Sequence, residues 1–555
     1  MTTATAVREP APPAPRTLPL AGALTGTGEL AKLALRRDRM LLPIWVYLVL
    51  VGTAVNAYTF AHLYKTQASR QAVAASGLSN PAFLFLYGRL NGTSVGALTA
   101  WRYGVWAALF AVLMSIFTVV RHTRASEDAG RLELIGSARV GRQAPLAAAL
   151  LVAGGANAVL AVALAVILPA IGLPAVGSIA LALAVGTTGL AFTGITAVTV
   201  QLARDARPAR GLALIVLGLS FLLRAVGDSA GARGPSWLTW ALPLGWTEML
   251  RPFAGERWWV LALPVAVFAA GTWLAFSLAA RRDQGAGLLP DRPGRPVASS
   301  LLRGPFSLAW RLQWATLAGW TAGYVFIFAV SGAAAEGIGQ LVGTSSALKN
   351  EFARLGGQSA IVNAYLASLM LLAGLIAAAY GVSAVLRLRS EESGALAEPV
   401  LVGGQSRVRW GLSHVLVAVA GSALLLAVAG VAAGLGYWMR APGVPAGAEV
   451  ARMLGAGMAQ LPAVCVIIGI AVLAFGLRPA AAVAIGWTAF GLALAINLFG
   501  QSLQLSHWVL DISPFTHVPR LPGGTVSAPP LLWLSLITLV FVAAGLAGLR
   551  RRDIG

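Results

Sequence analysis

Long apolar stretches recur along the whole chain, and short polar turns separate them. Each has about 18 or more residues, which is the length that a helix needs to cross a bilayer. The stretches lie at about 41–62, 98–120, 144–168, 175–203, 211–229, 257–280, 315–333, 361–386, 411–436, 455–477, 480–500 and 531–549. This pattern predicts an all-α polytopic membrane protein with about twelve transmembrane helices.

Shorter patterned segments accompany these spans. Residues 29–39 combine basic and apolar positions at helical spacing, and residues 306–311 have the same character. Each therefore predicts an amphipathic helix that lies in the membrane interface. Residues 237–246 are apolar but interrupted by proline, which predicts a re-entrant or surface-lying helix pair with tryptophan at the level of the lipid headgroups.

The second half of the chain repeats the first. Arg36 matches Arg311 at a step of about 275 residues, and Gly130 matches Gly394 at a step of about 264. An even number of spans in each half gives both halves the same orientation, which predicts a pseudo-two-fold axis along the membrane normal. The predicted organisation is a disordered tail at 1–18, an interfacial helix with six spans at 19–282, a cytoplasmic Gly/Pro/Arg linker at 283–304, and a second interfacial helix with six spans at 305–555.

Charged residues are few, and basic residues outnumber acidic ones. The 555 residues are 57% hydrophobic and only 11% charged, with a net charge of +21, whereas soluble domains carry about 25% charged residues. The arginines lie in short loops on alternate sides of the spans, which is the positive-inside pattern. We therefore expect membrane lipids rather than nucleic acid as partners, a multi-pass location in a bacterial plasma membrane, and both termini in the cytoplasm.

Carboxylates gather in two places, which we call acidic segment 1 (residues 126–134) and acidic segment 2 (residues 390–398). The first holds Glu127, Asp128, Gly130 and Glu133, and the second holds Glu391, Glu392, Gly394 and Glu398. Each follows a span that ends in arginines. The recurrence favours a short helix that inserts into a groove on a soluble partner; the alternative is a solvated loop that balances the neighbouring arginines.

Several side chains within the spans are candidates for an apolar cavity that takes a hydrophobic small molecule. They are Trp106, Phe110, Met114 and Phe117 on the second span, Phe221 on the fifth, Asn363 and Tyr365 on the eighth, and Phe490, Asn497 and Phe499 on the eleventh. Contact with lipid or packing between helices is an equally good interpretation. Arg224 and Asp228 are four residues apart near the end of a span, so they either pair and reach the surface or mark a functional site.

The sequence contains no Gly-x-x-x-x-Gly-Lys-Ser/Thr phosphate-binding loop, and its five histidines lack the spacing of metal ligands. We expect no catalytic residue, metal or cofactor in this chain. Residues 401–405, Leu-Val-Gly-Gly-Gln, resemble the Leu-Ser-Gly-Gly-Gln signature of ATP-binding-cassette (ABC) ATPases. Without a phosphate-binding loop they are better interpreted as a glycine turn that ends a helix.

The six-plus-six layout, the arginine-led stretches at 124–130 and 389–394 that run into the acidic segments, and the proline-broken outer segments at 242–246 and 513–517 resemble one known family. It is the membrane subunit of actinobacterial ABC exporters of the polyketide-antibiotic or tetronasin-resistance type. The resemblance implies a type-2 ABC exporter fold. It also implies a separately encoded cytoplasmic ATPase that binds as a dimer, carries the ATP and Mg²⁺, and drives outward transport of hydrophobic or amphipathic compounds.

On the same resemblance, the acidic segments are coupling helices, and the cavity lies between the second and fifth spans of one half and the eighth and eleventh of the other. A proton-driven transporter of the major-facilitator layout is the alternative. No chain of buried carboxylates for a proton relay is expected from the sequence, which argues against it. A membrane enzyme is a third class, and no cluster of His, Asp or Ser supports it.

Overall fold

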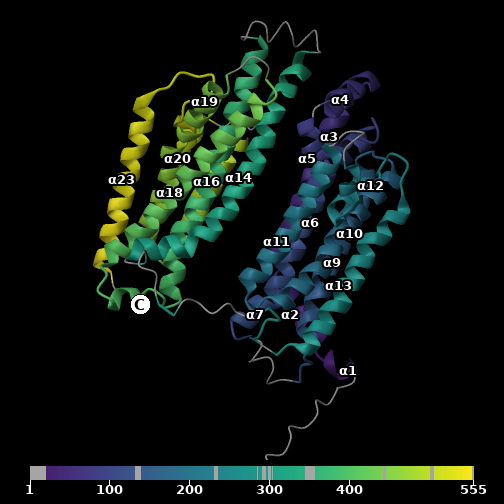
Figure 1. Ribbon diagram of the computed structural model, residues 1–555, viewed down its shortest axis with the longest axis horizontal. Coiled ribbons are helices and arrows are strands. Elements are labelled where there is room, and N and C mark those ends of the chain that lie inside the picture. The colour runs from purple at the N-terminus through teal and green to yellow at the C-terminus, as the bar shows by residue number, and fades with distance from the viewer. Residues whose placement is uncertain are drawn as a thin grey trace, which may run out of the picture. The chain divides into compact units, whose positions relative to one another are not determined.

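The computed structural model describes residues 20–79, 81–131, 139–229, 235–283, 285–289, 296–297, 302, 304–343, 357–441, 445–499 and 506–552. These residues form helices joined by short turns and contain no β-strand (Figure 1). Eleven described helices are long and apolar enough to cross a membrane, and a twelfth apolar stretch, Ala482–Leu498, is shorter. The predicted all-α polytopic fold is confirmed.

The chain divides into two compact units. Apart from residues 80–82, unit 1 runs from Met1 to Pro293 and unit 2 from Gly294 to Gly555. The division lies inside the stretch at 283–304 that the sequence marks as a linker. In each unit the acidic segment lies at the end of the second long helix or directly after it.

Unit 1 is built around α10 (Ala175–Leu202), which packs against four neighbouring spans (Figure 1). Its buried face consists mainly of Ala, Gly and Thr, and small residues let helix backbones approach closely. A Cβ on Gly271 would overlap the backbone of Gly194, so α10 and α13 touch there through glycine. The helices of unit 1 are α1 (Leu20–Ala23), α2 (Thr27–Arg37), α3 (Leu41–Leu63), α4 (Gln67–Ser79), α5 (Pro81–Tyr87), α6 (Val95–His122), α7 (Arg124–Asp128), α9 (Ala144–Ala170), α10, α11 (Ala206–Ser229), η1 (Ser236–Trp240), α12 (Pro243–Met249), η2 (Trp258–Leu261) and α13 (Ala262–Arg281).

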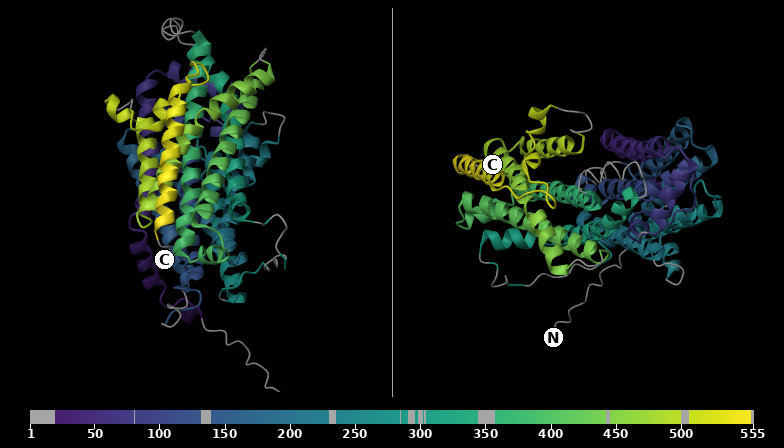
Figure 2. Two further views of the ribbon diagram at one scale, coloured as in Figure 1. Left: turned by 90° about the vertical axis from the view of Figure 1, so that its left-hand side faces the viewer. Right: turned by 90° about the horizontal axis from the view of Figure 1, so that it is seen from above.

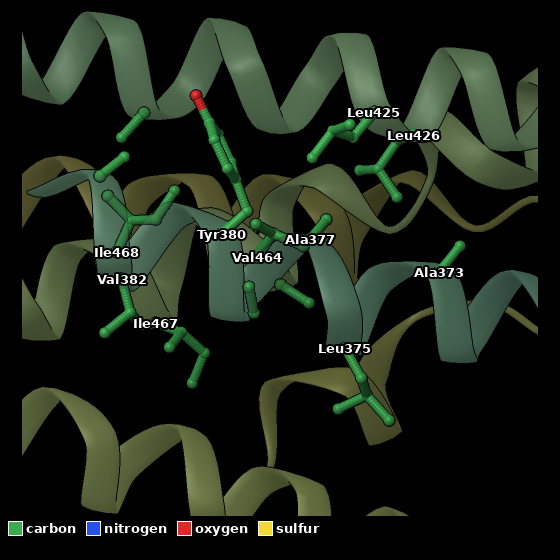
Figure 3. Packing of buried hydrophobic residues seen from close by; sticks show 14 of the residues in the cluster. Ala373, Leu375, Ala377, Tyr380, Val382, Leu425, Leu426, Val464, Ile467 and Ile468 are labelled. Carbon is green, nitrogen blue, oxygen red and sulfur yellow. The ribbon is translucent and has the colours of Figure 1, made fainter. Parts of the chain in front are cut away.

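Unit 2 has one large core, where α16, α18 and α20 meet (Figure 3). Tyr380 of α16 is 1% exposed, and a Cβ on Gly421 of α18 would overlap its ring, so the glycine makes room for the tyrosine. The last helix, α23, runs alongside α20 (Figure 2). The helices of unit 2 are α14 (Pro305–Gly343), α16 (Gly357–Ser393), α17 (Glu398–Val402), α18 (Arg407–Trp438), α19 (Ala446–Met458), α20 (Leu461–Leu477), α21 (Ala482–Phe499), α22 (His507–Leu510), η3 (Pro514–His517) and α23 (Ala528–Arg551).

The sequence-based expectation is wrong at the start of unit 2. A separate interfacial helix at 306–311 is not formed, because these residues are the first turns of the continuous helix α14. In unit 1 the chain leaves the helix at Asp38, whose buried carboxylate faces Arg121 and His122. At the matching position of unit 2, Gln313 reaches His414 from within the helix, so no turn is needed there.

Candidate functional site

Acidic segment 1 begins where α6 ends. Thr123 leaves the helical conformation, and the short helix α7 follows with Arg124 at its start. The Arg124 guanidinium is buried, donates to the carbonyl oxygens of Val200 and Ala286, and pairs with Glu127 at 2.9 Å. The segment is therefore fixed to α10 by a buried cation rather than left as a free loop.

Glu127 is enclosed by donors of its own unit. Its carboxylate lies 3.3 Å from the Arg282 guanidinium and accepts a hydrogen bond from the backbone N–H of Gly285 at 2.8 Å. Arg282 directly follows α13, the last span of unit 1. The side chain of Glu127 is only 10% exposed, so this ion pair joins acidic segment 1 to the last span.

The remaining residues of acidic segment 1 have different environments. Asp128 accepts a hydrogen bond at 2.8 Å from the backbone N–H of Ala206, the first residue of α11, and so caps that helix while remaining exposed. Gly130 has a φ of +67°, the left-handed conformation that commonly follows a helix. Glu133 lies outside the described residues.

In acidic segment 2, Glu391 lies on the last turns of α16 and is buried. It accepts hydrogen bonds from Arg387 at 2.9 Å and from the indole N–H of Trp410 at 3.3 Å. His414 lies 3.2 Å from the same carboxylate, and the other nitrogen of its ring faces Gln313 at 3.3 Å. Glu391 thus connects α16 with α18 and, through His414, with α14.

Glu392, the next residue, binds an arginine close to the C-terminal end of the chain. Its two carboxylate oxygens accept hydrogen bonds from Arg552 at 2.7 and 2.9 Å. Arg552 directly follows α23, the last span of unit 2. Unit 2 therefore contains the same relationship as the pair of Glu127 with Arg282: a glutamate of the acidic segment binds the arginine that follows the last span.

Acidic segment 2 continues into α17, and the exposed surface of the two is apolar as well as acidic. Leu396 is 64% exposed and Val402 is 89% exposed, and Glu398 is exposed between them. Gly394 closes α16 by donating to the Ser390 carbonyl. The short helix α17 ends at Val402. Residues 403–404 follow it and form the glycine turn that the sequence predicts, with a φ of +82° at the second glycine.

Two of the predicted cavity residues line an open groove of about 690 Å³ in unit 1. Trp106 and Phe110 of α6 lie there opposite α3. A Cβ on Gly52 of α3 would overlap the Tyr103 ring, so this glycine allows the tyrosine to lie against the helix. The Arg102 guanidinium lies over the Tyr87 ring at 4.1 Å from its centroid. The groove lining is Tyr47, Leu48, Val51, Gly52, Asn56, Tyr87, Arg102, Tyr103, Trp106 and Phe110.

The other candidates of unit 1 take part in packing. Met114 is 1% exposed within the core. Phe117 stacks on Trp45 with ring centroids 6.1 Å apart, and Phe221 lies 6.2 Å from Trp106. Phe221 therefore packs against Trp106, which lines the groove, whereas Met114 is not part of the groove lining.

The candidates of unit 2 are engaged with neighbouring segments. Asn363 accepts a hydrogen bond from Arg452 at 2.8 Å, and the Tyr365 hydroxyl donates to the Ser331 carbonyl at 3.1 Å. Asn497 donates to Ser513 at 2.6 Å and so holds the segment before η3 against α21. The ring of Phe490 lies 5.7 Å from that of Trp487. The side chain of Phe499 lies outside the described residues.

A buried charge cluster lies at the other end of unit 1 from α7 (Figure 1), and the sequence pointed to two of its members, Arg224 and Asp228, but not to Glu248 or Arg89. Arg224 is 1% exposed, so the interpretation that it reaches the surface is wrong. It lies 2.9 Å from Glu248 of α12 and 3.6 Å from Asp228, which Arg89 also approaches at 3.9 Å. Asp228 and Glu248 are thus two carboxylates of one arginine-paired cluster; the signal in the sequence was Glu248, an acidic residue just after the proline-broken segment at 237–246.

The same cluster shows how the segment at 237–246 is held. All residues of α12 from Pro243 to Glu248 are buried, so this helix packs into unit 1 rather than lying on its surface. The Leu244 N–H donates to the Ser220 hydroxyl at 3.1 Å, and the Thr239 hydroxyl donates to Asp228 at 2.8 Å.

Comparison with known proteins identifies relatives of both halves of the chain. The family model for the C-terminal domain of the multidrug efflux system permease Rv1217c matches residues 302–550. The chain is 41% identical over 531 residues to the multidrug efflux system permease protein Rv1217c of Mycobacterium tuberculosis, covering 96% of this chain and 95% of that protein. The likeness thus extends over both units.

Proposed function

The chain belongs to the family of ABC-exporter permease subunits represented by Rv1217c, and we propose that it moves hydrophobic or amphipathic compounds, such as polyketide-type antibiotics, outward at the expense of ATP. A separately encoded ATPase would supply the energy, bound as a dimer with one copy at each acidic segment. ATP and Mg²⁺ would belong to that partner. The arginine-rich helix ends beside both acidic segments support a cytoplasmic position for the segments and for both termini.

One observation carries the coupling part of this proposal. In each unit a glutamate of the acidic segment binds the arginine that follows the last span: Glu127 with Arg282, and Glu392 with Arg552. A displacement of the acidic segment would therefore move the last span of the same unit as well as the span to which the segment is attached. This is the linkage that a transporter needs if a soluble partner is to drive its spans.

The exposed residues of acidic segment 2 and of the adjoining α17 suit a docking surface. α17 has no buried residue among its five, and Leu396 and Val402 expose apolar side chains on either side of Glu398. Apolar side chains that gather on an exposed surface commonly mark an interaction site. We assign Glu127, Glu391 and Glu392 to holding the segments in place, and the exposed residues to contact with the ATPase.

The groove lined by Trp106 and Phe110 supports the proposed class of substrate. Ligand sites are mostly apolar, with few polar groups that fix orientation. The groove has aromatic walls, and Arg102 and Asn56 add a cation and an amide. Such a lining suits a molecule with a large apolar body and a polar group.

A proton-driven transporter is the second candidate, and the buried carboxylates of Asp228 and Glu248 favour it. Two guanidinium groups, those of Arg224 and Arg89, face these two carboxylates. Proton uptake by either carboxylate would leave two cations facing one carboxylate in this largely buried cluster, and uncompensated charge of that kind costs several kcal/mol by order of magnitude. The cluster therefore suits a fixed structural support better than a proton carrier.

The deciding experiment uses inside-out vesicles that contain this chain together with the ATPase encoded beside it. Accumulation of a fluorescent hydrophobic drug should require ATP and continue when an uncoupler removes the proton gradient. Replacing the phosphate-binding lysine of the partner should stop accumulation. Transport that stops with the uncoupler while ATP is held constant would favour the proton-driven candidate.

A further inference from the structure

A pocket of about 360 Å³ lies in unit 1 beside acidic segment 1, where α2 meets the start of α9. Leu30, Leu33 and Ala34 of α2 form one apolar wall. Pro145 and Ala148 of α9 form the opposite wall. The pocket is separate from the groove lined by Trp106, and no step of the proposed transport mechanism uses it.

Two guanidinium groups, those of Arg37 and Arg131, line the polar end of this pocket. Within the described part of the chain, neither makes a hydrogen bond or an ion pair. The nearest carboxylate, Asp38, already binds Arg121 at 3.1 Å and His122 at 2.6 Å. Burial lowers the pKa of Arg37, and the like charges of Arg131 and Arg121 lower it further, against the opposing effect of Asp38. Among the described residues, positive charge at this end therefore exceeds the negative charge of the carboxylates.

The pocket lies at the level where the membrane-spanning part of unit 1 begins. Arg37 ends α2, and the spanning helix α3 begins four residues later at Leu41. Leu33 and Leu35 of α2 are 55% and 50% exposed, as in amphipathic helices that lie in the membrane interface. The apolar walls therefore adjoin the acyl region, and the two arginines adjoin the headgroup region.

We propose that this pocket binds an anionic phospholipid. Arg37 and Arg131 would donate charge-assisted hydrogen bonds to the phosphate oxygens, the geometry for which guanidinium is well suited. One acyl chain would lie along Leu30 and Leu33. Since Ser126 of acidic segment 1 lines the same pocket, the bound lipid would join α2 to that segment.

The test uses the purified full-length chain in a neutral detergent after removal of bound lipid. Phosphatidylglycerol should raise the thermal unfolding midpoint and remain bound in native mass spectrometry, whereas phosphatidylcholine and inorganic phosphate should do neither. The double variant Arg37→Gln with Arg131→Gln should bind phosphatidylglycerol about tenfold or more weakly, because two charge-assisted hydrogen bonds are lost. The pair Arg37→Lys with Arg131→Lys keeps the charge and should retain most of the affinity.

The matched control is Arg36→Gln with Arg39→Gln, which removes the same charge from the same end of α2 outside the pocket. It should leave the affinity for phosphatidylglycerol nearly unchanged. An equal loss in both glutamine pairs would overturn the proposal, because surface attraction to anionic lipid would then account for the binding. Stabilisation by inorganic phosphate alone, equal to that by phosphatidylglycerol, would overturn the assignment to a lipid.

Discussion

Arg552 donates two hydrogen bonds to Glu392, at 2.7 and 2.9 Å, across 160 residues of sequence. Arg282 lies 3.3 Å from Glu127 in the other unit, again across a long stretch of sequence. In both units the pair joins the segment after the second span to the end of the last span. A bidentate guanidinium–carboxylate pair combines energy with a fixed geometry, so the recurrence points to a mechanical connection.

Breaking this connection in unit 2 should uncouple the transporter. Glu392→Gln and Arg552→Gln should each destabilise the contact by about 2 kcal/mol, the usual magnitude for a hydrogen bond to a charged group. We expect ATP-driven transport to fall while the partner ATPase remains bound. Drug efflux and ATPase retention measured on the same preparation check this.

The control for that pair is Arg551→Gln. Arg551 is the exposed neighbour of Arg552, and this substitution removes the same charge without touching the pair. The exchanged variant, Glu392→Arg with Arg552→Glu, should recover part of the lost efflux. Efflux that is unchanged in both single variants would show that the pair has no part in coupling.

The buried cluster of Arg224, Asp228 and Glu248 should act as a support of α12. Removing one partner of a buried pair costs about 3–5 kcal/mol, because the other charge stays buried without compensation. We therefore expect Arg224→Met, which leaves Glu248 without its cation, to lower the unfolding temperature strongly, and Glu248→Leu, which leaves Arg224 with Asp228, to lower it less. The double variant leaves Asp228 with Arg89 and should be more stable than Arg224→Met alone. Strictly additive destabilisation in a thermal unfolding assay would contradict the cluster as described.

The aromatic groove makes a separate prediction about substrate. Trp106→Ala removes a large wall residue and should raise the drug concentration that gives half-maximal stimulation of the partner's ATPase, without changing the basal rate. Burial of an aromatic side chain against a ligand contributes on the order of 2 kcal/mol, which corresponds to a shift of roughly thirtyfold.

Trp273→Ala is the matched control for the groove, since Trp273 lies on α13 and is 71% exposed. Its stimulation curve should match that of the unaltered chain. If the two variants shift the curve by the same amount, the groove does not hold the drug.

The spans were predictable because a membrane helix is encoded by one local property, a long apolar run, and all twelve stretches correspond to helices. The break near Asp38 was also predicted, as the division between the interfacial helix at 29–39 and the span at 41–62. The continuity at Gln313 was not, because it depends on a partner far away in the sequence, namely His414. The sequence located the acidic segments but gave no sign that Glu391 is buried. Its partner Trp410 lies on the next span, and no local pattern couples the two.

The central claim is that the acidic segments receive the ATPase, and the most direct measurement is ATPase retention on the tagged chain. Leu396→Asp with Val402→Asp changes one exposed side chain of acidic segment 2 and one of the adjoining α17 and leaves every described ion pair intact. The account predicts that this variant inserts and folds normally but retains much less ATPase in detergent, while Leu435→Asp, an exposed position on α18, retains the full amount. Full retention by the acidic-segment variant, with normal ATP-driven efflux, would contradict the account.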